Sequence, residues 1–112
     1  MNEENIMATL NILKDCGDSY KYQGPRFTVL GSNSGEDFRD NYLIPWLDNN
    51  QKDKELIIDF EGTIVYTPSF LEESFGGAIR KGYDIVKTLT FIHLPDTQLH
   101  KIQQYIGNAK PK

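Results

Sequence analysis

Apolar residues recur along this chain at two different periods, and the changes of period divide it into predicted strands and helices. Residues 6–13 alternate loosely at a period of two, which predicts a strand. Residues 26–30 are β-branched and aromatic and stop at Gly31, so we expect a second strand there. Residues 56–60 form a continuous apolar run, typical of a central strand covered on both faces. Residues 86–94 predict a fourth strand.

Three other segments have the spacing of amphipathic helices. Residues 34–47 begin with a hydroxyl and repeat apolar side chains every three to four positions, although Pro45 is expected to kink or split that helix. Residues 96–107 follow a proline and predict a last helix. Residues 69–81 predict the helix between them. Its apolar face contains Leu71, Phe75, Ala78 and Ile79.

The order of these elements favours one α/β domain over residues 1–112, with a small mixed sheet of about four strands. Strands separated by whole helices tend to run parallel, whereas the first two are close enough for a hairpin. We therefore expect helices packed mainly on one face of the sheet.

Composition narrows the class of protein. The 112 residues contain 12 basic and 16 acidic side chains, and this net charge of −4 argues against binding to nucleic acid through phosphates. No apolar run is long enough for a membrane span, and residues 1–5 lack the pattern of a secretory signal, so the sequence predicts a cytoplasmic location without membrane contact. The single cysteine, Cys16, has acidic neighbours and is expected to be an inert thiol.

The most informative stretch is residues 57–77, which predicts a buried strand, a turn and then a helix start that carries hydroxyl groups. Thr67 or Ser69 at that start is a candidate for a capping group, an anion contact or a phosphorylated residue, because the first backbone N–H groups of a helix lack partners. The plainest interpretation is a capping box, with Ser69 and Glu72 as its two members and Pro68 fixing the entry of the chain.

The same helix offers a candidate surface for a protein partner. Phe70 lies in the sequence near Gly76 and Gly77, whose bare backbone would allow a close approach. Tight packing of this helix on its own sheet is the alternative. The candidate interface residues are Pro68, Phe70, Glu73, Ser74 and Gly77.

Residues 31–35 form a glycine- and serine-rich loop ahead of the first predicted helix. Ser32, Ser34 and Gly35 could contact an anion there with help from Arg26. The loop lacks the lysine and the glycine spacing of a nucleotide-binding P-loop, so an ordinary connection between elements is the alternative.

The sequence predicts no metal site and no cofactor. His93 and His100 with Asp96 between them match no compact ligand spacing. Asp59 and Glu61 would share one face of a strand as an acid pair, but a carboxylate that caps a turn is the simpler interpretation. With no set of serine, histidine and acid visible either, we expect that the protein is not an enzyme.

Several segments together resemble a bacterial STAS-like family of unknown function. They are residues 59–62, residues 67–77 with their run Pro-Ser-Phe-Leu-Glu-Glu-Ser-Phe-Gly-Gly, and the earlier residues 26–27 and 34–39. The resemblance covers roughly residues 20–95. That family is similar in turn to the STAS domains of anti-sigma factor antagonists and sulphate transporters. The resemblance implies a small sheet with helices mainly on one face and a regulatory, non-catalytic role.

In the antagonists, a helix starts with an Asp-Ser-Ser-Gly-like turn in which a partner kinase phosphorylates a serine. In this chain Thr67 replaces the acid, Pro68 the first serine and Phe70 the glycine, whereas Ser69 matches the second serine. The resemblance thus implies a protein–protein interaction module of bacterial signalling whose partner is a protein such as a histidine-kinase-like ATPase. The alternative is a small-ligand or nucleotide sensor that binds an anion between residues 31–35 and 67–70.

Overall fold

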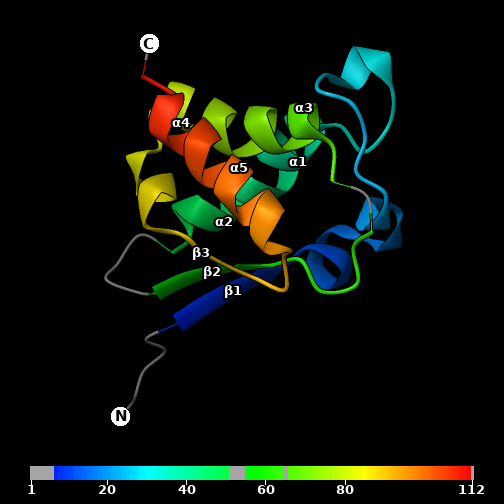
Figure 1. The fold of residues 1–112 in the computed structure, drawn as a ribbon, viewed down its shortest axis with the longest axis horizontal. Helices are drawn as coiled ribbons and strands as arrows, with labels where there is room; N and C mark the ends of the chain where they lie inside the picture. The colour runs from blue at the N-terminus through cyan, green and yellow to red at the C-terminus, as the bar shows by residue number, and fades with distance from the viewer. Residues whose placement is uncertain (1–6, 51–54, 65, 112) are drawn as a thin grey trace.

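The computed structural model describes residues 7–50, 55–64 and 66–111, and a three-stranded parallel sheet lies at one side of it (Figure 1). The strands β1 (Met7–Asn11), β2 (Glu55–Asp59) and β3 (Thr90–Ile92) run in the order β1-β2-β3. Both neighbouring pairs are parallel, with β2 in the centre. Within the described residues the sheet therefore has three strands rather than four and is not mixed.

The predicted strand at residues 26–30 is wrong. Phe27 is extended, but Thr28–Leu30 form one turn of 3-10 helix, closed by a hydrogen bond from the Leu30 N–H to the Phe27 carbonyl. A short apolar run indicates burial only if another element covers it, and nothing in the described chain covers this one. The turn projects beyond the helices, in cyan in Figure 1.

One helical segment runs from Gly35 to Asp48 and consists of α1 (Gly35–Phe38), a π turn (Arg39–Leu43) and α2 (Ile44–Asp48). Ser34 caps it as expected, since its hydroxyl accepts a hydrogen bond from the Asp37 N–H. Pro45 does not split the helix. The wider π turn ends at Leu43, two residues before the proline, where the helix has lost one backbone donor.

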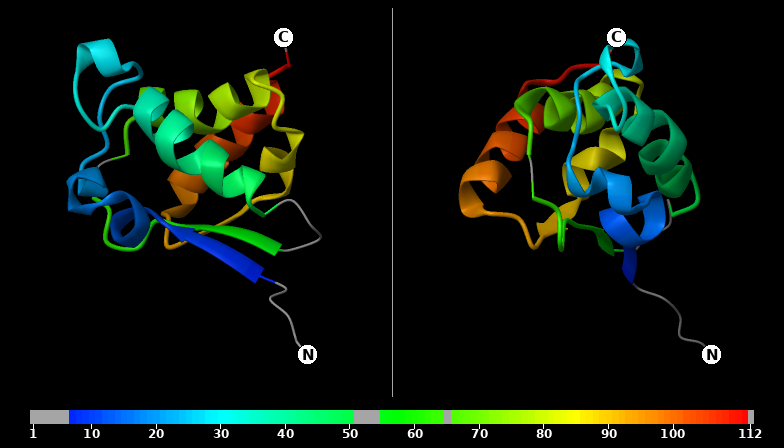
Figure 2. Two further views of the ribbon diagram at one scale, coloured as in Figure 1. Left: turned by 180° about the vertical axis from the view of Figure 1, so that it is seen from behind. Right: turned by 90° about the vertical axis from the view of Figure 1, so that its right-hand side faces the viewer.

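The second helical segment is α3 (Pro68–Leu71), a π turn (Glu72–Gly76) and α4 (Gly77–Arg80). It lies between the first helical segment and α5 (Asp96–Asn108), as the two views of Figure 2 show. The predicted apolar face is fully buried, and α5 confirms the predicted last helix. Because helices flank it on both sides, the second segment also buries residues that periodicity had placed on another face.

The helices cover only one face of the sheet (Figure 2). Leu10, Leu56 and Ile58 point from the strands into the core, whereas Thr9 and Ile57 alternate with them and retain exposed surface. The central strand is therefore not covered on both faces. No helix in the described part of the chain has both the length and the apolar character needed to cross a membrane.

Two predictions concern residues that lie partly outside the described ranges. Residues 1–5, on which the absence of a secretory signal was argued, and Ile6 of the first predicted strand lie outside the described residues. The last predicted strand is shorter than expected, because residues 84–88 form a 3-10 turn before β3 begins.

Candidate functional site

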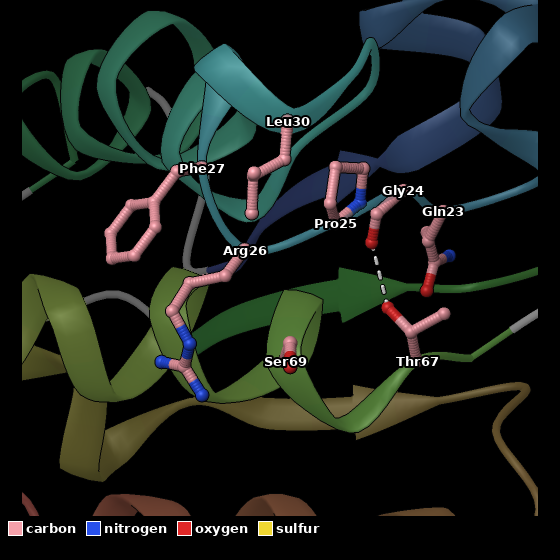
Figure 3. Close-up of a pocket in the computed structure, with 8 residues that line it drawn as sticks. All are labelled: Gln23, Gly24, Pro25, Arg26, Phe27, Leu30, Thr67 and Ser69. Atoms are coloured by element: carbon pink, nitrogen blue, oxygen red, sulfur yellow. Dashed lines mark hydrogen bonds between the residues drawn. The ribbon is translucent and has the colours of Figure 1, made fainter.

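A cavity of about 610 Å³ lies between the segment that precedes α1 and the start of α3 (Figure 3). Phe27 and Leu30 stand on one side of it, and Thr67 and Ser69 on the other. The fold thus brings Arg26 together with both candidate hydroxyl residues, which are more than 40 positions away in the sequence. The residues that line the cavity are Gln23, Gly24, Pro25, Arg26, Phe27, Leu30, Thr67 and Ser69.

Thr67 joins the two walls of this cavity. Its hydroxyl donates to the Gly24 carbonyl at 2.8 Å, the dashed line in Figure 3, and accepts from the Phe70 N–H at 3.3 Å. Thr67 is therefore the N-cap of α3, and Pro68 occupies the first turn, where its missing N–H costs nothing. The predicted capping box built on Ser69 is wrong, because the helix begins two residues earlier.

Ser69 is the more available of the two candidate phosphorylated residues. Its side chain is half-buried in the cavity wall, and its hydroxyl makes no hydrogen bond with any described residue. The Thr67 hydroxyl already has a donor and an acceptor, so modification there would break the helix cap.

The candidate interface on the helix face is corrected by burial. The Phe70 side chain is 0% exposed and lies 5.5 Å from the ring centre of Phe38. Ser74 is equally buried, and Glu73 and Gly77 are also buried. Of the five predicted interface residues, Pro68 alone is exposed. The alternative, tight packing of this helix within its own domain, describes the other four.

The glycine- and serine-rich loop does not reach the cavity. Ser34 is fully buried, and its hydroxyl also bonds the Thr28 hydroxyl at 2.8 Å. Gly35 packs its backbone against α3, where an added Cβ would lie 2.6 Å from the Phe70 carbonyl oxygen. Ser32 is exposed but does not line the cavity. Of the four predicted anion contacts only Arg26 does so, and the joint anion pocket with residues 31–35 is not formed.

The positive charge of Arg26 is neutralised by two glutamates of the second helical segment. Its guanidinium donates to Glu72 at 2.5 Å and to Glu73 at 3.1 Å. Arg80 also binds Glu72, at 2.6 Å, and the hydrogen bond from Arg80, followed by the one from Arg26, lowers the pKa of the Glu72 carboxyl. The cavity therefore has little free positive charge in its wall, and its other lining residues are mostly apolar.

The turn beside the cavity exposes an apolar surface, made of residues that were expected to form a strand. Phe27, Val29 and Leu30 are 43%, 90% and 69% exposed. Residues 28–30 are followed by a glycine, which favours a turn. Three residues are too few, however, for their apolar pattern to distinguish a turn from a strand.

Gln23 is a second feature that sequence reasoning missed. Its side chain is 3% exposed, and neither its amide nitrogen nor its amide oxygen has a hydrogen-bond partner among the residues that the structure describes. An unpaired buried polar atom costs about 1–3 kcal/mol. A residue with this cost in a cavity wall favours an occupant that carries hydrogen-bonding groups.

Cys16 is not part of the cavity, and its chemistry yields a prediction. Burial, followed by the charges of Asp15 and Asp37, raises the pKa of its thiol to about 12. We expect iodoacetamide at pH 8 to label the folded protein very slowly and the urea-unfolded protein at the rate of a free thiol, because the thiolate is the reactive form. Mass spectrometry over time measures both rates. Equal rates in the two states would show that Cys16 is exposed.

Comparison with known proteins adds the family. Residues 34–99, more than half of the chain, match the model of a family described as a STAS-like domain of unknown function. No curated protein and no solved structure matches. The matched part contains the start of α3 but not the segment with Gln23 and Phe27, so the cavity combines a family element with one that precedes the match. The chain belongs to this STAS-like family, which suggests a regulatory role.

Proposed function

We propose that this STAS-like chain is a non-catalytic regulatory module of bacterial signalling that binds a protein partner on the turn at residues 27–30 and over the cavity beside it. The observation that supports this most strongly is the exposure of Phe27, Val29 and Leu30. Single exposed apolar residues are normal on any surface, but three within four residues, of which Phe27 and Leu30 line a cavity, are typical of a contact site.

The turn suits a docking role for two physical reasons. Phe27 offers a large, rigid apolar surface of the kind that anchors protein interfaces. The turn is closed by its own backbone hydrogen bonds and preceded by Pro25, so ordering it on binding should cost little conformational entropy. The cavity beneath would accept a side chain of the partner.

Ser69 supplies a candidate switch for this interaction. A phosphoryl group would add about two negative charges to the cavity wall, directly beside the apolar turn, and would oppose the docking of an apolar anchor. The helix start tolerates negative charge, and the nearby Glu72 is already paired with Arg26 and Arg80. By its resemblance to anti-sigma factor antagonists, the proposed kinase is a histidine-kinase-like ATPase.

A small-ligand sensor is the second candidate function, and Gln23 favours it. The Gln23 amide, which has no partner among the described residues, would donate one hydrogen bond and accept another from a ligand with a neighbouring acceptor and donor. The neutralised Arg26 makes a bare anion a poor occupant. Such a ligand would raise Tm in a saturable manner, without any protein partner.

The test is an affinity pull-down from the native cell with the wild type and with the double variant Val29→Glu, Leu30→Glu. Both side chains are exposed, so we expect stability to change by no more than about 0.5 kcal/mol. The variant should lose the partner, because two charges would enter an apolar contact. The matched control is Gln103→Glu, Gln104→Glu, which adds the same charge at two exposed positions of α5.

Each outcome has a direct meaning. A partner that binds the wild type and the control but not the double variant supports docking on the turn, and an added phosphate mass on Ser69 of the recovered protein supports the switch. A partner retained by the double variant contradicts this surface. Saturable stabilisation by a small molecule in place of any partner would favour the sensor, and turnover of a substrate by the pure protein would contradict a non-catalytic role.

A further inference from the structure

The carboxyl ends of β2 and β3 bring together three potential metal ligands that are separated in the sequence. Asp59 is the last residue of β2 and is paired with Ile92 of β3, so His93 follows directly beside it. Glu61 lies two residues beyond Asp59. One ligand atom from each of Asp59, Glu61 and His93 lies within 4.8 Å of the other two. His100, which the sequence analysis paired with His93, is not in this group.

Asp59 is held in place at the centre of the cluster. Its carboxylate is largely buried, and one oxygen accepts from the Glu61 backbone N–H at 2.9 Å and lies 2.7 Å from Nδ1 of His93. The other oxygen accepts from the Asn11 side-chain amide at 3.3 Å, across the sheet from β1. Outer contacts of this kind orient the ligands of known metal sites.

In the part of the chain that the structure describes, no lysine or arginine balances the charge of this cluster. Elsewhere in the fold, Glu72 and Glu73 share the guanidinium groups of three arginines. Among residues 7–50, 55–64 and 66–111, by contrast, no lysine or arginine forms an ion pair with Asp59 or Glu61. Two carboxylates therefore face a single imidazole, and a divalent cation would neutralise both.

We propose that Asp59, Glu61 and His93 form a binding site for a divalent transition metal of the Zn²⁺ class. An imidazole nitrogen with two carboxylate oxygens suits such ions, whereas Mg²⁺ and Ca²⁺ prefer oxygen ligands alone. Glu61 and His93 are exposed, so their side chains have the freedom to close on an ion next to the fixed Asp59. Three protein ligands leave a fourth position for water or for a group of a partner.

The bound ion would join the ends of two neighbouring strands, and this gives the site a readout besides affinity. The three ligands are brought together only by the fold, since 32 positions separate Glu61 from His93 (93 − 61). The metal should therefore bind the native state better than the unfolded chain and raise Tm.

The test uses the tag-free, metal-depleted full chain titrated with ZnCl₂ in a calorimeter, with the rise in Tm recorded in parallel. We expect saturable binding of one ion, weakened at least about 10-fold in Glu61→Gln and in His93→Asn. Asparagine is chosen because His93 has φ +57°, a conformation that asparagine tolerates. Both changes are at exposed side chains, so the variants should remain folded. The matched control is His100→Asn, an exposed histidine on α5 outside the cluster.

Binding with wild-type affinity in the His100 variant, together with loss in the other two, supports the site. The proposal is overturned if the wild type shows no saturable binding, if all three variants bind as tightly as the wild type, or if His100→Asn weakens binding as much as His93→Asn does. An equal rise in Tm for the wild type and for Glu61→Gln would also overturn it, because that rise would arise from another part of the chain.

Discussion

Replacement of Phe70 by alanine should lower the free energy of unfolding by about 3–5 kcal/mol, the range for removing a large aromatic side chain from a core. The ring is fully buried and lies among other aromatic rings, with its centre 5.5 Å from that of Phe38 and 6.2 Å from that of Tyr20. The second helical segment lies between two other helical segments, which prevent the space left by the ring from collapsing. The variant therefore keeps most of the new void in its core. Urea unfolding followed by circular dichroism measures the loss.

Phe27→Ala is the matched control, because it removes the same side chain from the exposed turn. Its cost should be below about 1 kcal/mol, since most large effects arise from buried positions. Phe70→Ala with near-wild-type stability would contradict the packing described above and would restore Phe70 as a surface residue. Comparing the two variants therefore distinguishes a phenylalanine that stabilises the core from one that lies on the exposed turn.

Replacement of Glu73 by glutamine should cost about 1–3 kcal/mol, because it removes one of the two carboxylates that pair with the buried guanidinium of Arg39. Glu73 binds Arg39, whose side chain is only 6% exposed, and also lies within ion-pair distance of Arg26 and Arg80. The remaining partner of Arg39 is the exposed Asp40, which binds Nε and Nη2 and not the Nη1 that faces Glu73. Thermal and urea unfolding both report the change.

Two further variants provide controls for the stability of Glu73→Gln. Asp84→Asn removes an exposed acid that pairs with Lys87, and it should change stability by less than about 1 kcal/mol. The double variant Arg39→Met, Glu73→Leu removes both buried charges, and it should be more stable than Glu73→Gln alone, since apolar side chains can replace a buried ion pair. A double variant less stable than the single one would show that Arg39 has a separate structural role.

The helices were predictable because their signals are local. Apolar spacing located all three helical segments, and the hydroxyl of Ser34 marked the start of the first one. The burial of Phe70 was not predictable in this way, since periodicity identifies one apolar face. A helix between two others is buried on both sides, and the arginines that pair with Glu72 and Glu73 come from other parts of the chain.

The candidate sites depended on contacts between distant residues. The sequence identified Thr67 and Ser69 at a helix start and Arg26 as a possible helper, but only the fold shows that Arg26 is neutralised and that Gln23 lies in the same wall. Residues 27–30 have the composition of a strand, and only the fold shows that they form an exposed turn. The pairing of Asp59 with His93 follows from the register of β2 and β3, for which the sequence has no local signal.

The parallel sheet has a consequence for how the chain reaches its native state. β1 and β2 pair residues 48 positions apart, for example Leu10 with Ile58, and no hairpin within the described residues offers a shorter contact. The entropy of closing such a long loop must be overcome before the sheet contributes, so refolding should be slower than that of a helical bundle of similar length. During synthesis, β3 cannot join the sheet until the chain has been made as far as Ile92. Until then, the helices that precede β3 in the chain form only part of the core, because the sheet that they pack against is incomplete.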